Sequence, residues 1–330
     1  MSGFVARNRL ILLAYAGVAV LLLITALFSP GFLAPSNLRS TLVLAAFVGI
    51  VAFGQTFVII GGGIDLSIPW VLNCAALLLT LMAGGQDVAL IWVIPLLLAG
   101  GAAIGFVNGA GVALFGVPPI IMTLAVNVIL QGLILVYTGG SPTPSTPALI
   151  KYLAVGRVGP IPVIVLIWAA LALLATVLLS KSAFGRHVYA LGTSATVAEF
   201  SGVPTARTTI LTYMISGVTA ALAGILLTGY SGVAYLGMGD AYLFTSVAAV
   251  AIGGASILGG SGHYLGTVAG ALVLTILTGL LPALNLSNGA LLVVYGAVIL
   301  VTVSISSETW GELFRHLRAS ARSRQGETSG

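Results

Sequence analysis

The sequence predicts an all-α integral membrane protein with about ten transmembrane helices, and composition and uncharged length carry that prediction. Hydrophobic residues make up 59% of the chain and charged residues 6%, whereas charged residues make up roughly 25% of soluble domains. Two stretches, Val88–Ile150 and Ala241–Ser307, contain no Asp, Glu, Lys or Arg. Each is about three times longer than the roughly 20 residues that one spanning helix needs. A soluble globular fold is therefore excluded.

The apolar runs define ten predicted spans in chain order. The first follows Arg7 and Arg9, and we expect it to stay uncleaved because no small-x-small cleavage site follows Phe28. Spans beside glycine breaks are candidates for re-entrant segments, so eight or nine true crossings remain open. The predicted segments are Leu10–Phe28, Ser40–Gly61, Leu66–Met82, Val88–Val107, Pro118–Tyr137, Pro160–Ser180, Thr208–Thr228, Tyr242–Leu258, Tyr264–Leu281 and Asn288–Ser304.

Basic residues orient these spans, because cytoplasmic loops carry an excess of Lys and Arg. With the N-terminus inside, only Arg39, Lys151 and Arg157 fall outside. The pattern predicts an even number of crossings, a polytopic membrane domain over residues 1–309 and a basic cytoplasmic tail over residues 310–330. The cytoplasmic set is Arg7, Arg9, Lys181, Arg186, Arg207, Arg315, Arg318, Arg322 and Arg324.

A glycine triplet followed by a carboxylate separates the second predicted span from the third. Gly61–Gly63 is followed closely by Asp65, and no other charge lies between Thr41 and Asp87. A carboxylate at membrane depth costs roughly 2.5–3.5 kcal/mol, and an unwound backbone there must be buried in protein or line water. We expect a transport site or pathway at this break; the alternative is that Asp65 caps the next helix at the membrane surface.

A second glycine-rich break follows the eighth span. It comprises Gly253-Gly254 and Gly259-Gly260-Ser261-Gly262. Paired breaks in the two halves of a transporter point to a binding pathway between pseudo-symmetric repeats. We therefore expect pseudo-symmetric halves with glycine-broken helices, although residue identity between the two breaks is slight.

The long cytoplasmic connection, residues 181–207, predicts a short capped helix. Thr193 or Ser194 is a suitable N-cap, and Gly202 suits the position just after the helix, before Pro204. The helix expected over Ala195–Ser201 has only about two turns, so it needs a docking surface to stay formed. A partner protein is the favoured surface; the lipid surface is the alternative, weakened by the small apolar area of this segment.

Three blocks together resemble a known family. Gly54–Ser67 resembles the signature of the permease subunits of ribose- and monosaccharide-type ABC importers. Phe184–Val203 resembles the ATPase-docking loop of that family, and Ala248–Thr267 resembles a third block of it. The blocks match in order and spacing over most of the chain.

The resemblance implies a multi-pass subunit of the bacterial cytoplasmic (inner) membrane without catalytic residues. It implies a homo- or heterodimer of permeases, two cytoplasmic ABC ATPase subunits and an external substrate-binding protein. ATP and Mg would bind the partner ATPase, so this chain would bind no cofactor. The family departures are Pro69-Trp70 after Ile68, Glu199 where Arg is more common, and Ser261 where a basic residue is frequent. The ATPase-coupling residues that the resemblance assigns are Ala190, Gly192, Ala198, Glu199, Ser201 and Gly202.

Polar side chains inside apolar spans are the candidates for contact with a sugar, because they donate and accept hydrogen bonds without carrying charge. Each has the alternative role of an interhelical hydrogen bond, worth about 0.6 kcal/mol. Asn127 and Gln131, four residues apart, share a helix face. The predicted pathway residues are Gln55, Asp65, Ser67, Asn73, Asn108, Asn127 and Gln131.

Other functions have weaker support. Cys74 is the single cysteine, and His187, His263 and His316 lie far apart in sequence and near no acidic residue. We therefore expect neither a disulfide nor a metal site. An intramembrane enzyme would need an acid–base or nucleophilic set, which Asp65 lacks nearby in sequence. The closer alternative is a secondary carrier of a small polar solute, driven by an ion gradient and active without an ATPase.

Overall fold

The computed structural model describes residues 9–139 and 146–283, together with residues 289, 292–293, 295–297 and 300. The predicted span Asn288–Ser304 lies largely outside the described residues, and the tail 310–330 lies wholly outside them. The elements in order are α2 Arg9–Phe28, η1 Pro30–Leu33, α3 Pro35–Ile60, α4 Ile68–Ala83, η2 Asp87–Ala89, α5 Leu90–Phe115, α6 Pro119–Thr138, α7 Ala148–Val155, β1 Arg157–Val158, β2 Ile161–Pro162, α8 Val163–Lys181, α9 Ala183–Thr193, α10 Ala195–Phe200, α11 Thr205–Ser231, α12 Tyr242–Ile252 and α13 Tyr264–Ala283.

The all-α prediction is confirmed, and most predicted spans match a helix. Within the described residues, six helices are long and apolar enough to cross a membrane, and α4, α12 and α13 contain shorter apolar segments. The expected span Tyr242–Leu258 is wrong in length, because α12 ends at Ile252 and Gly254 adopts a left-handed conformation with φ 83°. Two helices were not expected: α7, and α9 within the connection over residues 181–207.

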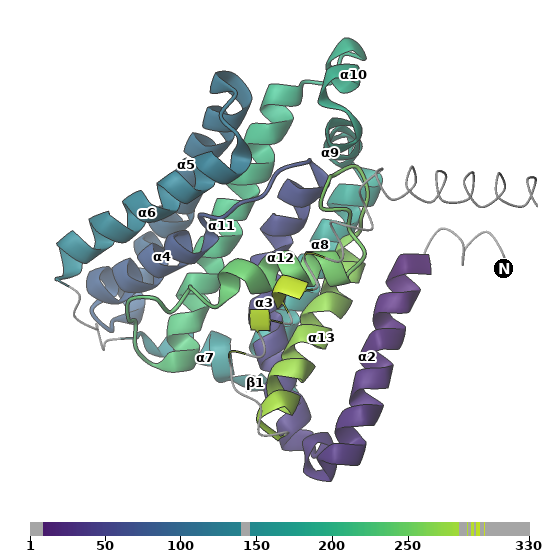
Figure 1. Cartoon of the computed structure of the whole chain (residues 1–330). Coiled ribbons are helices and arrows are strands. Elements are labelled where there is room, and N and C mark those ends of the chain that lie inside the picture. Colours follow the sequence, from purple (N-terminus) through teal and green to yellow (C-terminus); the bar gives the residue numbers. More distant parts are fainter. Residues whose placement is uncertain are drawn as a thin grey trace, which may run out of the picture.

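Helix α3 forms the centre of the molecule and is buried on nearly all sides from Val43 to Ile60. Helices α11, α13, α12 and α8 pack against it, and Figure 1 shows α2 at the edge of the bundle beside α13. Such a helix has no polar face, which is why its sequence shows continuous hydrophobicity rather than a 3.6-residue period.

Helices α5 and α11 approach each other closely through glycine. Gly101, Gly105 and Gly109 recur every four residues on α5, and a Cβ at each would clash with the α11 backbone. The arrangement is reciprocal, because a Cβ on Gly217 of α11 would clash with the Gly101 carbonyl. Small residues at this spacing allow helices to pack backbone to backbone in lipid. The contact fixes α11 against α5 beside the first glycine break.

The two ends of the molecule differ. Helices α9 and α10 lie together at one end, whereas α7 and strand β1 lie at the other (Figure 1). Strands β1 and β2 form a small antiparallel hairpin in which Val158 pairs with Ile161. The long connections at the two ends therefore make two different surfaces.

Candidate functional site

The first glycine break joins α3 to α4. Helix α3 ends at Ile60, and Gly62 has φ 86°, a left-handed conformation that glycine adopts without steric cost. The backbone N–H of Gly63 donates to the Val58 carbonyl at 2.9 Å, which closes the end of α3. Helix α4 then begins at Ile68 with Pro69 in its first turn, where a missing N–H costs nothing. Residues 61–67 are thus an unwound segment between two apolar helices.

Asp65 lies inside this segment and is 1% exposed. Its Oδ1 accepts hydrogen bonds from the backbone N–H of Ser67 at 2.9 Å and from Ser67 Oγ at 2.6 Å. Its Oδ2 accepts one from Ser216 Oγ on α11 at 2.7 Å. A buried carboxylate costs less when donors surround it in this way. Asp65 therefore both organises the start of α4 and ties the break to α11.

Helices α5 and α6 complete the network. Asn108 Nδ2 on α5 donates to Ser67 Oγ at 2.8 Å, so one chain of hydrogen bonds runs from Asn108 through Ser67 to Asp65. Thr123 Oγ1 on α6 accepts from the Leu66 N–H at 3.0 Å. The break is held by hydrogen bonds from three other helices. The Asn108 Oδ1 atom has no partner among the described residues.

The remaining predicted pathway residues do not join this network. Gln55 on α3 is fully buried, and neither of its amide atoms has a hydrogen-bond partner within the described part of the chain. Asn73 on α4 accepts from the Gly237 N–H at 3.0 Å and so anchors the loop before α12. Asn127 and Gln131 lie on α6, where Gln131 is exposed and the partly exposed Asn127 has an Oδ1 without a described partner.

The second glycine break contacts the first directly. The Gly260 N–H donates to the carbonyl of Ile60, the last residue of α3, at 2.9 Å. Gly192 of α9 packs onto this pair so closely that a Cβ there would overlap both the Ile60 carbonyl oxygen and the Gly260 nitrogen. Tyr189 Oη, also on α9, donates to the Gly262 carbonyl at 2.7 Å. We call this contact of α9 with the two breaks the glycine junction.

Two titratable groups at the glycine junction stay neutral. Burial raises the pKa of the Tyr189 hydroxyl, so Tyr189 remains a donor near neutral pH. Burial lowers the pKa of the His263 imidazole. His263 Nδ1 accepts from the Leu265 N–H at 3.1 Å, so in neutral His263 the proton lies on Nε2, 3.2 Å from Ser180 Oγ. Neutral His263 thereby joins the end of α8 to the start of α13.

The short helix expected over Ala195–Ser201 is present as α10, one residue shorter than predicted. Ser194 is its N-cap and accepts from the Val197 N–H at 3.3 Å, and Gly202 after the helix has φ 79°. Val197 and Phe200 are 63% and 88% exposed, whereas Ala198 is 4% exposed. The exposed surface of α10 therefore carries two large apolar side chains that no described residue covers.

The six predicted coupling residues thus divide into two groups. Glu199, Ser201 and Gly202 are exposed at the end of α10. Ala198 is buried within the chain, and Gly192 faces the glycine junction. Ala190 is partly buried on α9. Sequence reasoning missed Tyr189 and Ser216, and it missed that the two breaks touch, because no short-range pattern signals contacts between residues so far apart in the chain.

Comparison with known proteins gives a consistent result. The family model described as "Branched-chain amino acid transport system / permease component" matches residues 37–303. The chain is similar to the ribose import permease protein RbsC of Bacillus subtilis (strain 168), with 36% identity over 88% of this chain and 90% of that protein. It is 34% identical to RbsC of Escherichia coli (strain K12), over 88% of this chain and 91% of that protein.

A further relative is named for a different solute. The autoinducer 2 import system permease protein LsrD of Yersinia pseudotuberculosis serotype O:3 (strain YPIII) is 33% identical, over 82% of each chain. No solved structure matches the chain.

Proposed function

This chain belongs to the permease family whose model describes the permease component of branched-chain amino acid transport systems, and we propose that it is the membrane-spanning subunit of an ATP-driven sugar importer. The observation that carries this proposal is its similarity to ribose import permeases over 88% of its length. The substrate class is ribose or a related small polyhydroxylated solute. The chain is a transport component, and ATP hydrolysis with its Mg belongs to partner ATPase subunits.

Helix α10 is the part of the chain that docks the ATPase. Its outer face offers Val197 and Phe200, and an exposed aromatic side chain of this kind is a typical binding hot spot when a partner buries it. Glu199 on the same short helix adds an acidic group at the contact. This charge selects an ATPase with a basic or neutral groove.

The glycine junction transmits the movement of the docked loop to both broken helices. Gly192 touches the end of α3 and the segment before α13 at once, so a displacement of α9 moves the two breaks together. The Asp65 network, in turn, ties the first break to α5, α6 and α11. ATP binding and hydrolysis in the partner would alternate access through these connections.

Gln55 and Asn108 are the fully buried pathway residues that have an amide atom without a partner among the described residues; Asn127 also has one, but its side chain is partly exposed. A buried polar atom without a partner is costly, and a sugar hydroxyl or an ordered water in the pathway would satisfy it. We assign these two residues to substrate contact. Asp65, Ser67 and Asn73 act in this proposal by holding the backbone around the path, because their polar atoms already have partners within the chain.

The orientation follows from the basic residues. Lys181, Arg186 and Arg207 lie around α9 and α10, the end that we place in the cytoplasm. Lys151 and Arg157 lie on α7 and β1 at the other end (Figure 1), where an external binding protein would deliver the substrate. Both termini are placed inside, in a multi-pass protein of the bacterial inner membrane.

A second permease copy is proposed to pack on α6. Helix α6 is largely uncovered in the single chain, and Asn127 and Gln131 recur four residues apart on it. Polar side chains on an apolar span are costly against lipid and contribute hydrogen bonds between helices. Whether the second copy is identical or a sister chain is part of what purification would reveal.

Affinity purification of the tagged chain from native membranes tests the proposal. We expect an ABC-type ATPase in the eluate, identified by mass spectrometry, and its loss when Gly202 is replaced by Pro in an inserted, folded variant. A purified chain that stays folded but carries no ATPase under gentle detergent would contradict the proposal and favour a gradient-driven carrier.

A further inference from the structure

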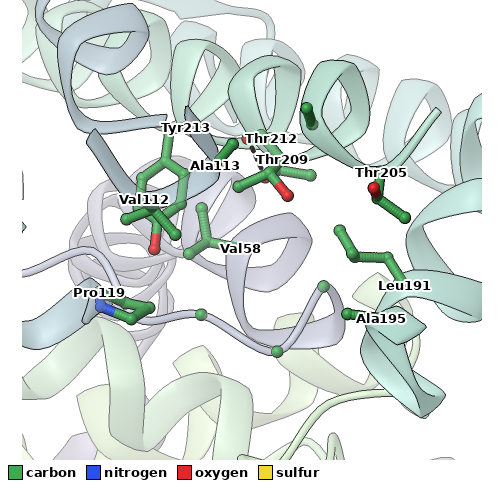
Figure 2. A pocket seen from close by; sticks show the side chains of 14 residues that line it. Val58, Val112, Ala113, Pro119, Leu191, Ala195, Thr205, Thr209, Thr212 and Tyr213 are labelled. Atoms are coloured by element: carbon green, nitrogen blue, oxygen red, sulfur yellow. Dashed lines mark hydrogen bonds between the residues drawn. The ribbon is translucent and has the colours of Figure 1, made fainter. Parts of the chain in front are cut away.

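A cavity of about 280 Å³ lies between the first glycine break and the docking loop. Gly61–Gly63 line one side of it, and the first two turns of α11 line another. Figure 2 shows Leu191, Ala195, Thr209 and Tyr213 around this space, so α9 and α10 also contribute to its wall. Small-molecule sites occupy roughly 300–1,000 Å³. The size of the cavity suits one small ligand.

Helix α11 gives this cavity a wall of hydroxyl groups. Thr205, Thr209, Thr212 and Tyr213 follow one another at helical spacing and all line it. Thr212 Oγ1 is bound to the Thr209 carbonyl at 2.7 Å. The Thr205 and Thr209 side-chain hydroxyls make no hydrogen bond to any described residue, although many helical threonines of this chain, Thr208 among them, bond back to a carbonyl. These two hydroxyls are available to a ligand.

The glycine break supplies the complementary groups. The N–H groups of Gly61, Gly62 and Gly63 all donate back to carbonyls of α3, while no described residue donates to their own carbonyl oxygens. Unwound backbone is tolerated at membrane depth where it lines a water-filled cavity. Carbonyl acceptors thus flank a space that also offers threonine hydroxyls, which donate and accept.

Among the residues that the structure describes, no charged side chain lines the cavity. A neutral ligand with several hydroxyl groups matches this lining, because it can donate to the glycine carbonyls and exchange hydrogen bonds with Thr205 and Thr209. Tyr213 at the inner side reaches the Ile64 carbonyl at 3.4 Å. The cavity is therefore next to the segment that holds Asp65, on the side where the docking loop lies.

We propose that this cavity is a binding site for a single neutral monosaccharide, the last one before release to the cytoplasm, with Thr205 and Thr209 as the residues that recognise its hydroxyl groups. The inference rests on the importer function proposed above. Because Leu191 and Ala195 belong to α9 and α10, movement of the docked loop reshapes the cavity wall. Sugar release is thereby tied to the state of the ATPase.

The first test is transport by the complete importer in proteoliposomes, with a panel of D-ribose, D-xylose and D-galactose. The Thr205→Val/Thr209→Val variant keeps the shape of both side chains and removes both hydroxyl groups. We expect uptake of the transported sugar to fall at least fivefold, with ATPase association unchanged. Thr208→Val is the matched control, because the Thr208 hydroxyl bonds the Pro204 carbonyl and does not line the cavity; its uptake should stay near the wild-type rate.

The second test is protection of a cysteine. The native cysteine is first removed by Cys74→Ala in the complete importer, and Thr209→Cys is introduced. The new thiol should react with a polar maleimide added from the cytoplasmic side. A saturating concentration of the transported sugar should slow this reaction at least twofold. Arg207→Cys, on an exposed position outside the cavity, should show no protection. Equal labelling with and without sugar, together with full uptake by the double valine variant, would overturn the site. Wild-type complex that imports no panel sugar would instead overturn the sugar-import function itself.

Discussion

Replacing Gly192 with Ala tests how the docking loop is connected to the membrane helices. A Cβ at this position would lie closer than 3.0 Å to both the Ile60 carbonyl oxygen and the Gly260 nitrogen, whereas ordinary contact begins at 3.4 Å. The backbones must separate by at least about 1 Å to restore ordinary contact, which disrupts the 2.9 Å hydrogen bond between Gly260 and Ile60. Overpacking of this kind costs about 1–3 kcal/mol, partly offset by up to about 1 kcal/mol of improved helix propensity in α9.

The assay is sugar uptake per ATP hydrolysed by the reconstituted complex. Coupling energies of about 1–3 kcal/mol correspond to roughly 5–150-fold effects, so we expect this ratio to fall at least about fivefold. ATPase association should persist, because the outer face of α10 is unchanged. Gly17→Ala on α2 is the matched control, since Gly17 also lies inside a helix and a Cβ there meets nothing within 4 Å. Normal coupling in Gly192→Ala would refute the glycine junction as the connection.

Three further predictions concern the network, the docking face and the pH response. Asp65→Asn should lower the melting temperature in detergent and reduce sugar uptake per ATP hydrolysed. The reason is that an amide cannot accept from all three donors, and each hydrogen bond to a charged group contributes about 1.5–3 kcal/mol. A variant with unchanged melting temperature and uptake would contradict the role of this network. Phe200→Ala should weaken ATPase binding in a co-purification titration at least about fivefold, whereas Phe28→Ala at the far end of α2 should not. Because the pKa of His263 is lower in the folded protein, the folded state loses stability as pH falls from the unfolded pKa, about 6.5, towards the lower folded value. Thermal unfolding should show this loss between pH 7 and 5. A His263→Asn variant that shows the same loss would assign it to another group.

Hydrophobicity and glycine placement predicted most of the fold. The long apolar runs within the described residues are helical, because a membrane requires every backbone group to be satisfied within the segment. The breaks at Gly62 and Gly254 could also be predicted from the sequence, since glycine adopts left-handed conformations without steric cost. The exact end of α12 could not be predicted, because Ala255–Leu258 continues the apolar run and the hydrogen bonds of Gly260 and Gly262 to α3 and α9 join residues far apart in the chain.

Only part of the candidate site could be predicted from the sequence. Asp65 and Ser67 were identified, because a charge inside a membrane span is unusual and Ser67 lies two residues away. Their partners Ser216 and Asn108 come from helices 151 and 41 residues distant in the chain, and small polar residues in apolar spans are too common to be paired from the sequence. Gly192 was assigned through resemblance to a family docking loop; the structure places it inward, against the glycine junction.

Reconstitution of transport tests the central claim most directly. The purified chain is placed in proteoliposomes alone, with its ATPase, and with its ATPase and binding protein, and uptake of radiolabelled D-ribose is followed with and without ATP. The account predicts sugar uptake only in the complete assembly and only with ATP. Uptake by the chain alone, driven by a proton or sodium gradient, would contradict it.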